Sequence, residues 1–221
     1  MMSRKKPIIQ KITSIVKKEL SKESTGHDWW HIERVWKMAK RIAKEEKVKV
    51  DMFVVEAAAL LHDIADWKFY KGDDTVGPTK ASSILSSCGV PKPRIDHIVK
   101  IIKDISFKGI NVSSQMKTTE GKIVQDADRL DALGAIGIAR TFAYGGKIGN
   151  PIHDPTLKPH YHETFEEYKS KRSSSINHFY EKLLLLKNLM NTKTAKKIAE
   201  RRQNFMETFL RKFYLEWEEE L

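Results

Sequence analysis

Apolar residues recur along almost the whole chain at the spacing of an amphipathic α-helix. A first predicted helix ends before Ser24, and later ones begin near Pro78 and at Pro91 and Pro93. Further helices are predicted at about 28–47, 51–67, 120–142, 164–190 and 194–218. Irregular segments are expected at about 107–119 and 144–155. Because no alternating strand pattern competes with these helices, the sequence predicts an all-α fold.

One of these helices, at about 51–67, is apolar on most of its sides, which is typical of a helix buried at the centre of a bundle. The chain contains no internal repeat and no low-complexity linker. We therefore predict a single domain over residues 1–221, with a core of about 24–142 and C-terminal helices of about 160–219 packed on it. Gly134 and Gly137 lie inside the predicted helix 120–142 and indicate close helix packing there.

Composition excludes several classes of protein. With 40% apolar and 9% aromatic residues, the chain is too hydrophobic to be intrinsically disordered. Its one cysteine, Cys88, excludes an internal disulfide and a multi-cysteine metal site. The sequence shows neither an apolar run long enough to span a membrane nor a secretory signal, so a cytoplasmic location is expected.

The net charge of +11 favours a polyanionic partner such as a nucleotide, a phosphorylated metabolite or nucleic acid. A lysine-rich solvated surface explains the charge equally well. The basic residues are scattered, and no zinc-finger spacing or arginine-rich arm is present. A helical nucleic-acid-binding protein with a structural metal therefore stays an alternative, less favoured than a small-molecule substrate.

Histidines and carboxylates on otherwise apolar helix faces suggest a metal site. His31 shares a face with Val35, His62 follows a run of alanines and leucines, and Asp63 is next to it. Asp128 lies on an apolar face of a later helix, where a carboxylate must be paired, hydrogen-bonded or bound to a metal. Taken singly, each residue fits a hydrogen-bonded core position. Together they indicate a mixed imidazole and carboxylate site for a divalent ion.

Four segments give these residues a family context. They are GHDWWHIERV (26–35), AALLHDI (58–64), QDADRLDA (125–132) and GGKIGNPIHD (145–154). In this order they resemble the HD-domain metal-dependent phosphohydrolases, and in particular a small bacterial and archaeal branch similar to nucleoside triphosphate pyrophosphohydrolases. The resemblance extends over roughly residues 10–200. It implies an all-helical HD domain whose central buried helix carries the His-Asp pair.

The resemblance further implies that His31, His62, Asp63 and Asp128 bind one divalent ion. Mn²⁺ is favoured, with Mg²⁺, Fe²⁺, Co²⁺, Ni²⁺ and Zn²⁺ as alternatives. The implied reaction is cleavage of a (deoxy)nucleoside triphosphate to monophosphate and pyrophosphate through a metal-bound water. A phosphodiesterase or a monophosphatase of the same superfamily stays an alternative. The oligomeric state is open, and a homodimer is one option.

Further roles follow from the positions of polar residues near these motifs. We interpret Asp66 as the first candidate for a general base, beside the catalytic ligand Asp63. Glu56 and Asp131 are expected to support the ligands. Ordinary surface or ion-pair roles fit all of these residues except Asp63. Residues expected to contact substrate, each of which also fits a solvated position, are Arg34, Lys68, Lys80, Arg129, Lys147, His153 and His27.

Overall fold

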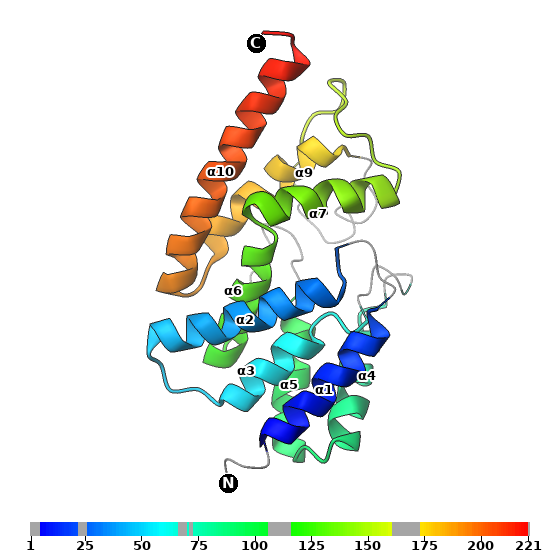
Figure 1. The fold of residues 1–221 in the computed structure, drawn as a ribbon, viewed down its shortest axis with the longest axis vertical. Coiled ribbons are helices and arrows are strands. Elements are labelled where there is room, and N and C mark those ends of the chain that lie inside the picture. The colour runs from blue at the N-terminus through cyan, green and yellow to red at the C-terminus, as the bar shows by residue number, and fades with distance from the viewer. Residues whose placement is uncertain are drawn as a thin grey trace. The chain divides into compact units, whose positions relative to one another are not determined.

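The structure is a computed structural model, and it describes residues 5–21, 26–65, 70, 73–105, 116–160 and 173–220. Every regular element in these ranges is helical, so the predicted all-α class is confirmed. Figure 1 shows the helices and their labels. None of the helices in these ranges has the length and apolar character that a membrane-spanning segment needs.

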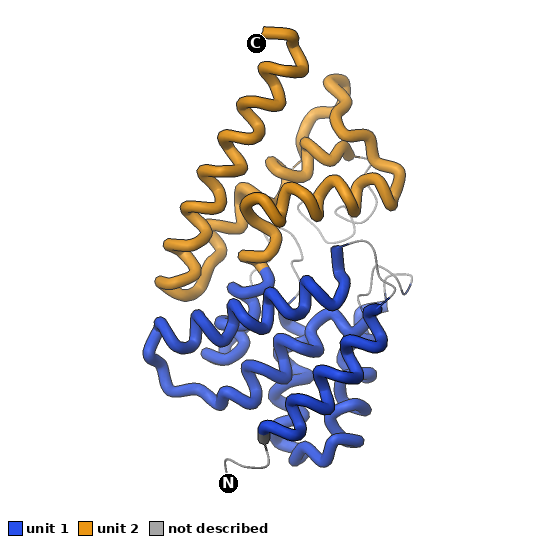
Figure 2. The backbone as a smooth tube through the Cα atoms, viewed as in Figure 1, with its two compact units in different colours: residues 1–107, 114–128 blue, residues 108–113, 129–221 orange. Residues whose placement is uncertain are grey.

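The chain divides into two compact units, which Figure 2 colours separately. Unit 1 comprises residues 1–107 and 114–128, and unit 2 comprises residues 108–113 and 129–221. The boundary falls inside one helix, α6 (Thr119–Asp131). The prediction of a single domain over 1–221 concerns the relation between the units and stays a prediction.

Unit 1 is built around a short apolar helix, α3 (Met52–Leu61). All of its residues except Met52 and Glu56 are buried, and it packs against three other helices. The remaining helices of this unit are α1 (Lys5–Glu19), α2 (Trp29–Glu46), α4 (Val76–Ser87), α5 (Lys92–Asp104) and most of α6. The helices in contact with α3 are α1, α2 and α5. The predicted central buried helix is therefore present, although it is shorter than the expected 51–67.

Unit 2 contains α7 (Gly134–Lys147), α9 (Ser175–Glu181), a 3₁₀ helix η3 (Leu183–Leu189) and α10 (Lys193–Trp217). The long helix α10 packs on α7 and η3. Phe142 of α7, Phe179 of α9 and Phe209 of α10 pack together, with ring centroids 5.8–6.1 Å apart. Aromatic pairs at this separation add to the stabilisation from apolar burial.

The predicted helix 120–142 is wrong as one element, because the chain breaks between α6 and α7. Gly134 adopts a φ of 73°, a left-handed conformation that glycine accepts without strain. A Cβ atom at Gly137 would lie 2.2 Å from the carbonyl oxygen of Ala132. The two glycines therefore permit a sharp break with close backbone contact, rather than the close packing inside a continuous helix that we expected.

Other boundaries also differ from the pattern. The predicted helix 164–190 is divided, within the described residues, into α9 and η3, and residues 161–172 lie outside them. The segment expected to be irregular from Tyr144 begins later, because α7 continues to Lys147. By contrast, α10 matches the predicted 194–218 to within one residue at either end. Helix ends depend on local capping and tertiary packing, which periodicity does not report.

Candidate metal centre

The first histidine of the site is placed by the start of α2. Asp28 is the N-cap of this helix, and its side chain accepts a hydrogen bond of 2.9 Å from the backbone N–H of His31. This bond satisfies one of the free donors at the helix start and fixes its register. The same face of α2 buries Ile32 and Val35, so the His31 side chain is carried into the interior and is fully buried.

The His-Asp pair lies in the turn that directly follows α3, rather than inside a helix as expected. His62 is almost completely buried, and its Nδ1 lies 2.9 Å from the carbonyl oxygen of Ala59. Because a carbonyl oxygen can only accept, Nδ1 of His62 carries a proton in this bond. The bond orients the ring and leaves Nε2 to face the other polar side chains.

Four side chains meet at this point. Nε2 of His31 lies 3.1 Å from Nε2 of His62. The same nitrogen lies 3.3 Å from Oδ2 of Asp63 and 3.5 Å from Oδ1 of Asp128. Nε2 of His62 lies 3.8 Å from Oδ2 of Asp63 and 3.6 Å from Oδ1 of Asp128. The structure thus brings together all four residues predicted as ligands, from α2, the turn after α3, and α6.

These separations fit the ligand shell of a divalent ion. With metal–ligand bonds of about 2.0–2.2 Å, neighbouring ligand atoms are about 2.8–3.6 Å apart in octahedral or tetrahedral geometry. Four of the five distances fall in this interval, and the separation between His62 and Asp63 lies just above it. His31, His62 and Asp128 form one group able to hold an ion, and His27, His31 and Asp63 form another.

The charges of the site also favour a cation. Burial alone would lower the pKa of His62, but the carboxylates of Asp63 and Asp128 outweigh this effect and raise the pKa to about 9. Burial acts to raise the pKa of Asp63, yet His62 and His27 hold it well below its usual range. The pKa of Asp128 is lowered to about 2 because its interactions with His62 exceed the effect of burial. Two ionised carboxylates thus face the imidazoles, and a divalent ion would replace the proton on His62.

Access differs between the two kinds of ligand. The imidazole side chains of His31 and His62 are 0% and 1% exposed, whereas the carboxyl side chains of Asp63 and Asp128 are 17% and 32% exposed. An ion at this position would be held from the interior by nitrogen atoms. It would face solvent on the side of the carboxylates.

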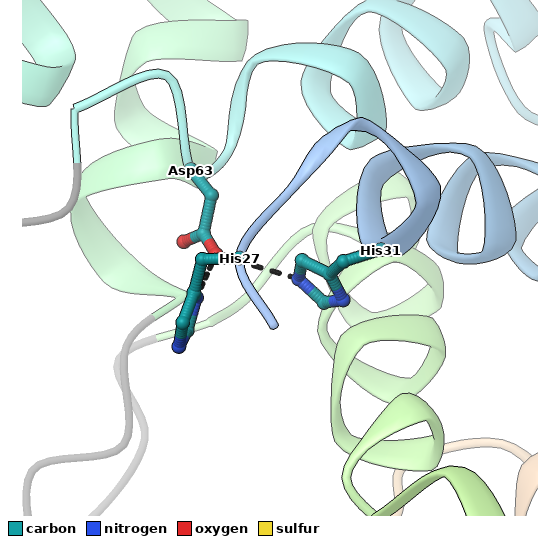
Figure 3. Close-up of side chains that lie close together, drawn as sticks. All are labelled: His27, His31 and Asp63. Carbon is teal, nitrogen blue, oxygen red and sulfur yellow. Dashed lines mark hydrogen bonds and ion pairs between the residues drawn. The ribbon is translucent and has the colours of Figure 1, made fainter. Parts of the chain in front are cut away.

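A third histidine adjoins this site, as Figure 3 shows. Nδ1 of His27 lies 2.7 Å from Oδ2 of Asp63, the same oxygen that approaches His31. His27 is half-buried and precedes the N-cap of α2 by one residue. We expected this residue to contact substrate. The structure instead places its Nδ1 against a predicted metal ligand.

Five of the remaining predicted site residues either lie outside the described residues or are carried by α2, α4 and α7. Asp66 and Lys68 lie outside the described residues. Lys80 forms an ion pair of 2.6 Å with Glu19, and Lys147 is exposed at the end of α7. Arg34 is half-buried on α2. None of these placements tests a role in substrate binding.

Two further predicted contacts lie in unit 2. Arg129 is buried and donates a hydrogen bond to the carbonyl oxygen of Leu189. The ring of His153 packs edge-on against aromatic rings of α10. The interacting rings are those of Phe213, Tyr214 and Trp217. Both side chains therefore have a structural contact within their own unit, while the predicted role in substrate binding stays a prediction.

The two carboxylates expected to support the ligands each have a partner within their own unit. Glu56 accepts a 2.9 Å hydrogen bond from the indole N–H of Trp36 and so links α3 to α2. Asp131 forms an ion pair with Arg140 at 3.1 Å. The sequence offered no signal for either pairing, because both partners are distant along the chain or across a helix break. Trp36 and Arg140 were therefore missed.

Comparison with known proteins provides the family context. A family model described as the HD domain matches residues 29–133. The uncharacterized protein YpgQ of Bacillus subtilis is 40% identical over 205 residues, which cover 91% of this chain and 90% of YpgQ. Among solved structures, an HD-superfamily hydrolase from Bacillus thuringiensis is 45% identical with a TM-score of 0.72, covering 97% of this chain and 98% of its own.

Two other crystal structures extend the comparison. A protein from Lactobacillus plantarum is 37% identical with a TM-score of 0.86, and the match covers 96% of this chain and 97% of that one. Bacillus subtilis YpgQ in complex with ADP is 36% identical with a TM-score of 0.71, covering 93% of this chain and 95% of YpgQ. The similarity therefore extends over nearly the whole length of both proteins.

Proposed function

The chain belongs to the HD domain family and is a metal-dependent phosphohydrolase of the HD superfamily, and on this premise we propose that it cleaves (deoxy)nucleoside triphosphates to monophosphate and pyrophosphate. The observation that carries the proposal is the meeting of two buried imidazoles with two ionised carboxylates. The nitrogen-to-oxygen separations among them are 3.3–3.8 Å.

The residues that would hold the ion are His31, His62, Asp63 and Asp128. Their mixture of nitrogen and oxygen donors suits a first-row divalent cation such as Mn²⁺, Fe²⁺, Co²⁺, Ni²⁺ or Zn²⁺. When bound, such an ion lowers the pKa of a water molecule and neutralises charge on a phosphoryl group in the transition state. The hydrogen bond from His62 to Ala59 keeps its Nε2 directed at the site, and the two carboxylates leave the site open toward solvent.

Two observations support a nucleotide as substrate. The similar protein YpgQ has been crystallised in complex with ADP. The chain carries a net charge of +11, which favours polyphosphate over a neutral substrate. Among the cations proposed to contact the phosphates, Arg34 lies on α2, the helix that carries His31.

The test is an activity assay in which metal content and products are both measured. Bound metal is determined by elemental analysis, and a panel of nucleotides is then assayed with Mn²⁺, Mg²⁺, Co²⁺ and Ni²⁺. We expect about one ion per chain, as a single four-ligand site requires, and release of pyrophosphate from triphosphates. Asp63→Ala should abolish ion binding and pyrophosphate release. His97→Ala changes a histidine that belongs to neither metal-binding group, and it should leave ion binding and pyrophosphate release unchanged.

The products separate the proposed reaction from its alternatives. Inorganic phosphate released from a nucleoside monophosphate would identify a monophosphatase, and opening of a cyclic nucleotide would identify a phosphodiesterase. Bound metal without turnover on any nucleotide would reject the proposed substrate class. Turnover that is unaffected by Asp63→Ala would reject the proposed site.

A further inference from the structure

His27 has a contact that the metal site alone does not require. Its Nδ1 lies 2.7 Å from Oδ2 of Asp63, and this oxygen is also the one that lies 3.3 Å from Nε2 of His31. We propose that His27 is a positioning residue, whose N–H holds the Asp63 carboxylate in the orientation that the divalent ion requires. The inference rests on the proposed function of the four-ligand site and adds a residue to it.

The distance between His27 and Asp63 is that of a direct hydrogen bond. A separation of 2.7 Å between Nδ1 and Oδ2 is typical of a charge-assisted N–H···O bond. His27, His31 and Asp63 also lie close enough to form a group that could hold an ion. Because the proposed site already has four donors in His31, His62, Asp63 and Asp128, we assign His27 to the hydrogen bond and not to the ion.

The bond also fixes the protonation of His27. An ionised carboxylate can only accept hydrogen bonds, so Nδ1 of His27 is the donor in the 2.7 Å bond to Asp63. Nδ1 of His27 must therefore carry the proton. This is the arrangement of an outer-shell partner, which orients a ligand without touching the ion.

The local chain holds His27 in place. Gly26 has a φ of 86°, a left-handed conformation that turns the chain just before His27. Asp28 then caps α2 through the N–H of His31, so the stretch from His27 to His31 is fixed to the helix start. The two histidine rings contact each other edge to face, with centroids 5.6 Å apart and planes inclined by 71°. The turn that places the predicted metal ligand His31 therefore also fixes the position of the N–H donor of His27.

The bond from His27 restrains the Asp63 side chain, which is 17% exposed and lies in a turn rather than in a helix. Without the bond from His27, the carboxylate could rotate away from the imidazoles toward solvent. With the bond, its Oδ2 stays directed at Nε2 of His31, where the carboxylate would help to hold the ion. Loss of such an outer-shell partner typically weakens metal binding by about 10–100-fold.

Three variants test the donor directly. His27→Asn places an amide N–H close to the position of Nδ1, His27→Gln displaces the amide by one bond, and His27→Ala removes it. Mn²⁺ affinity is measured for each by calorimetry, and Co²⁺ loading is followed by its visible absorption, which reports ligand geometry. We expect His27→Ala and His27→Gln to lose about 10–100-fold in affinity, and His27→Asn to stay within about threefold of wild type.

The controls separate positioning from a general effect on folding. The thermal midpoints of the metal-free wild type and variants are compared, and His97→Ala is included as a histidine outside both metal-binding groups. His27→Ala with unchanged Mn²⁺ affinity and an unchanged Co²⁺ spectrum would overturn the inference. Equal Mn²⁺ affinities of His27→Asn and His27→Gln, both below that of wild type, would overturn it too. This comparison does not depend on whether the alanine variant folds. A wild type that binds no ion would instead refute the proposed function.

Discussion

If the proposed site binds its divalent ion, removal of that ion is expected to destabilise the whole of unit 1, because the four proposed ligands come from separate parts of the chain. His31 and His62 are about 30 residues apart, and Asp128 follows Asp63 by about 65. An unfolded chain does not bring these side chains together, so binding of the ion adds its free energy to that of folding. The folded protein should therefore melt at a higher temperature with the ion than without it.

The free energy by which the ion stabilises the folded state follows from mass action. At a free ion concentration of 100 times the dissociation constant, binding stabilises the folded state by about 2.7 kcal/mol. For a chain of 221 residues, each kcal/mol raises the melting temperature by about 2–4 °C. We therefore expect the melting temperature of the loaded protein to lie about 5–11 °C above that of the chelated protein.

The assay compares thermal unfolding with Mn²⁺ and with a chelator, for the wild type and two matched variants. Asp128→Asn changes the most exposed of the four ligands and so disturbs packing least. A loss of at least about tenfold in affinity would reduce the stabilisation by the ion to about 1.4 kcal/mol or less at the same ion concentration. Asp96→Asn makes the same chemical change in an exposed pair with Lys92 and should keep the full shift.

Three results would contradict this reasoning. Equal melting temperatures with saturating Mn²⁺ and with chelator would mean that the ion does not link the three elements. A full shift in Asp128→Asn would mean that the ion is bound without Asp128. A loss of the shift in Asp96→Asn would point to a non-specific effect of surface charge.

Two further predictions concern protons and the helix break. Since the pKa of metal-free His62 is raised to about 9, its proton stabilises the fold below pH 6.5 and this contribution is lost as pH rises through 9. Ion binding at pH 7 should therefore release a proton, which calorimetry in buffers of different ionisation enthalpy would detect; an enthalpy independent of buffer would contradict this. Gly137→Ala should destabilise by about 1–3 kcal/mol, because its Cβ would meet Ala132. Gly146→Ala, where nothing lies within 4 Å, should not destabilise, and equal denaturation midpoints for the two variants would contradict the clash.

Sequence periodicity was sufficient to predict a buried helix where apolar residues continue along its whole length. The apolar α3 is buried as predicted, because a face that lacks polar groups can only be stable against other apolar groups. The four expected metal ligands also meet in the structure. Three of them were recognisable because polar groups on apolar helix faces need a buried partner. Asp63 was added by its adjacency to His62.

Periodicity failed where the chain reverses or a helix ends. The break before Gly134 depends on a left-handed backbone conformation and on contact with Ala132, neither of which changes the apolar spacing. The end of α3 before His62 was missed for a similar reason, since the apolar pattern continues into the turn. The contacts of Glu56 with Trp36 and of Asp131 with Arg140 were also missed, because they depend on packing and on the helix break. The supporting roles of Glu56 and Asp131 stay predictions.

The sequence by itself determined the all-α class, the family and the set of side chains able to hold a divalent ion, because these follow from composition, period and the order of motifs. Only the tertiary structure decided which atoms meet. The 2.7 Å bond between His27 and Asp63, and the orientation of His62 by Ala59, depend on turns whose geometry is set by a few backbone angles. Residues four apart in a sequence predict a shared helix face, but a hydrogen bond across two elements requires their packing.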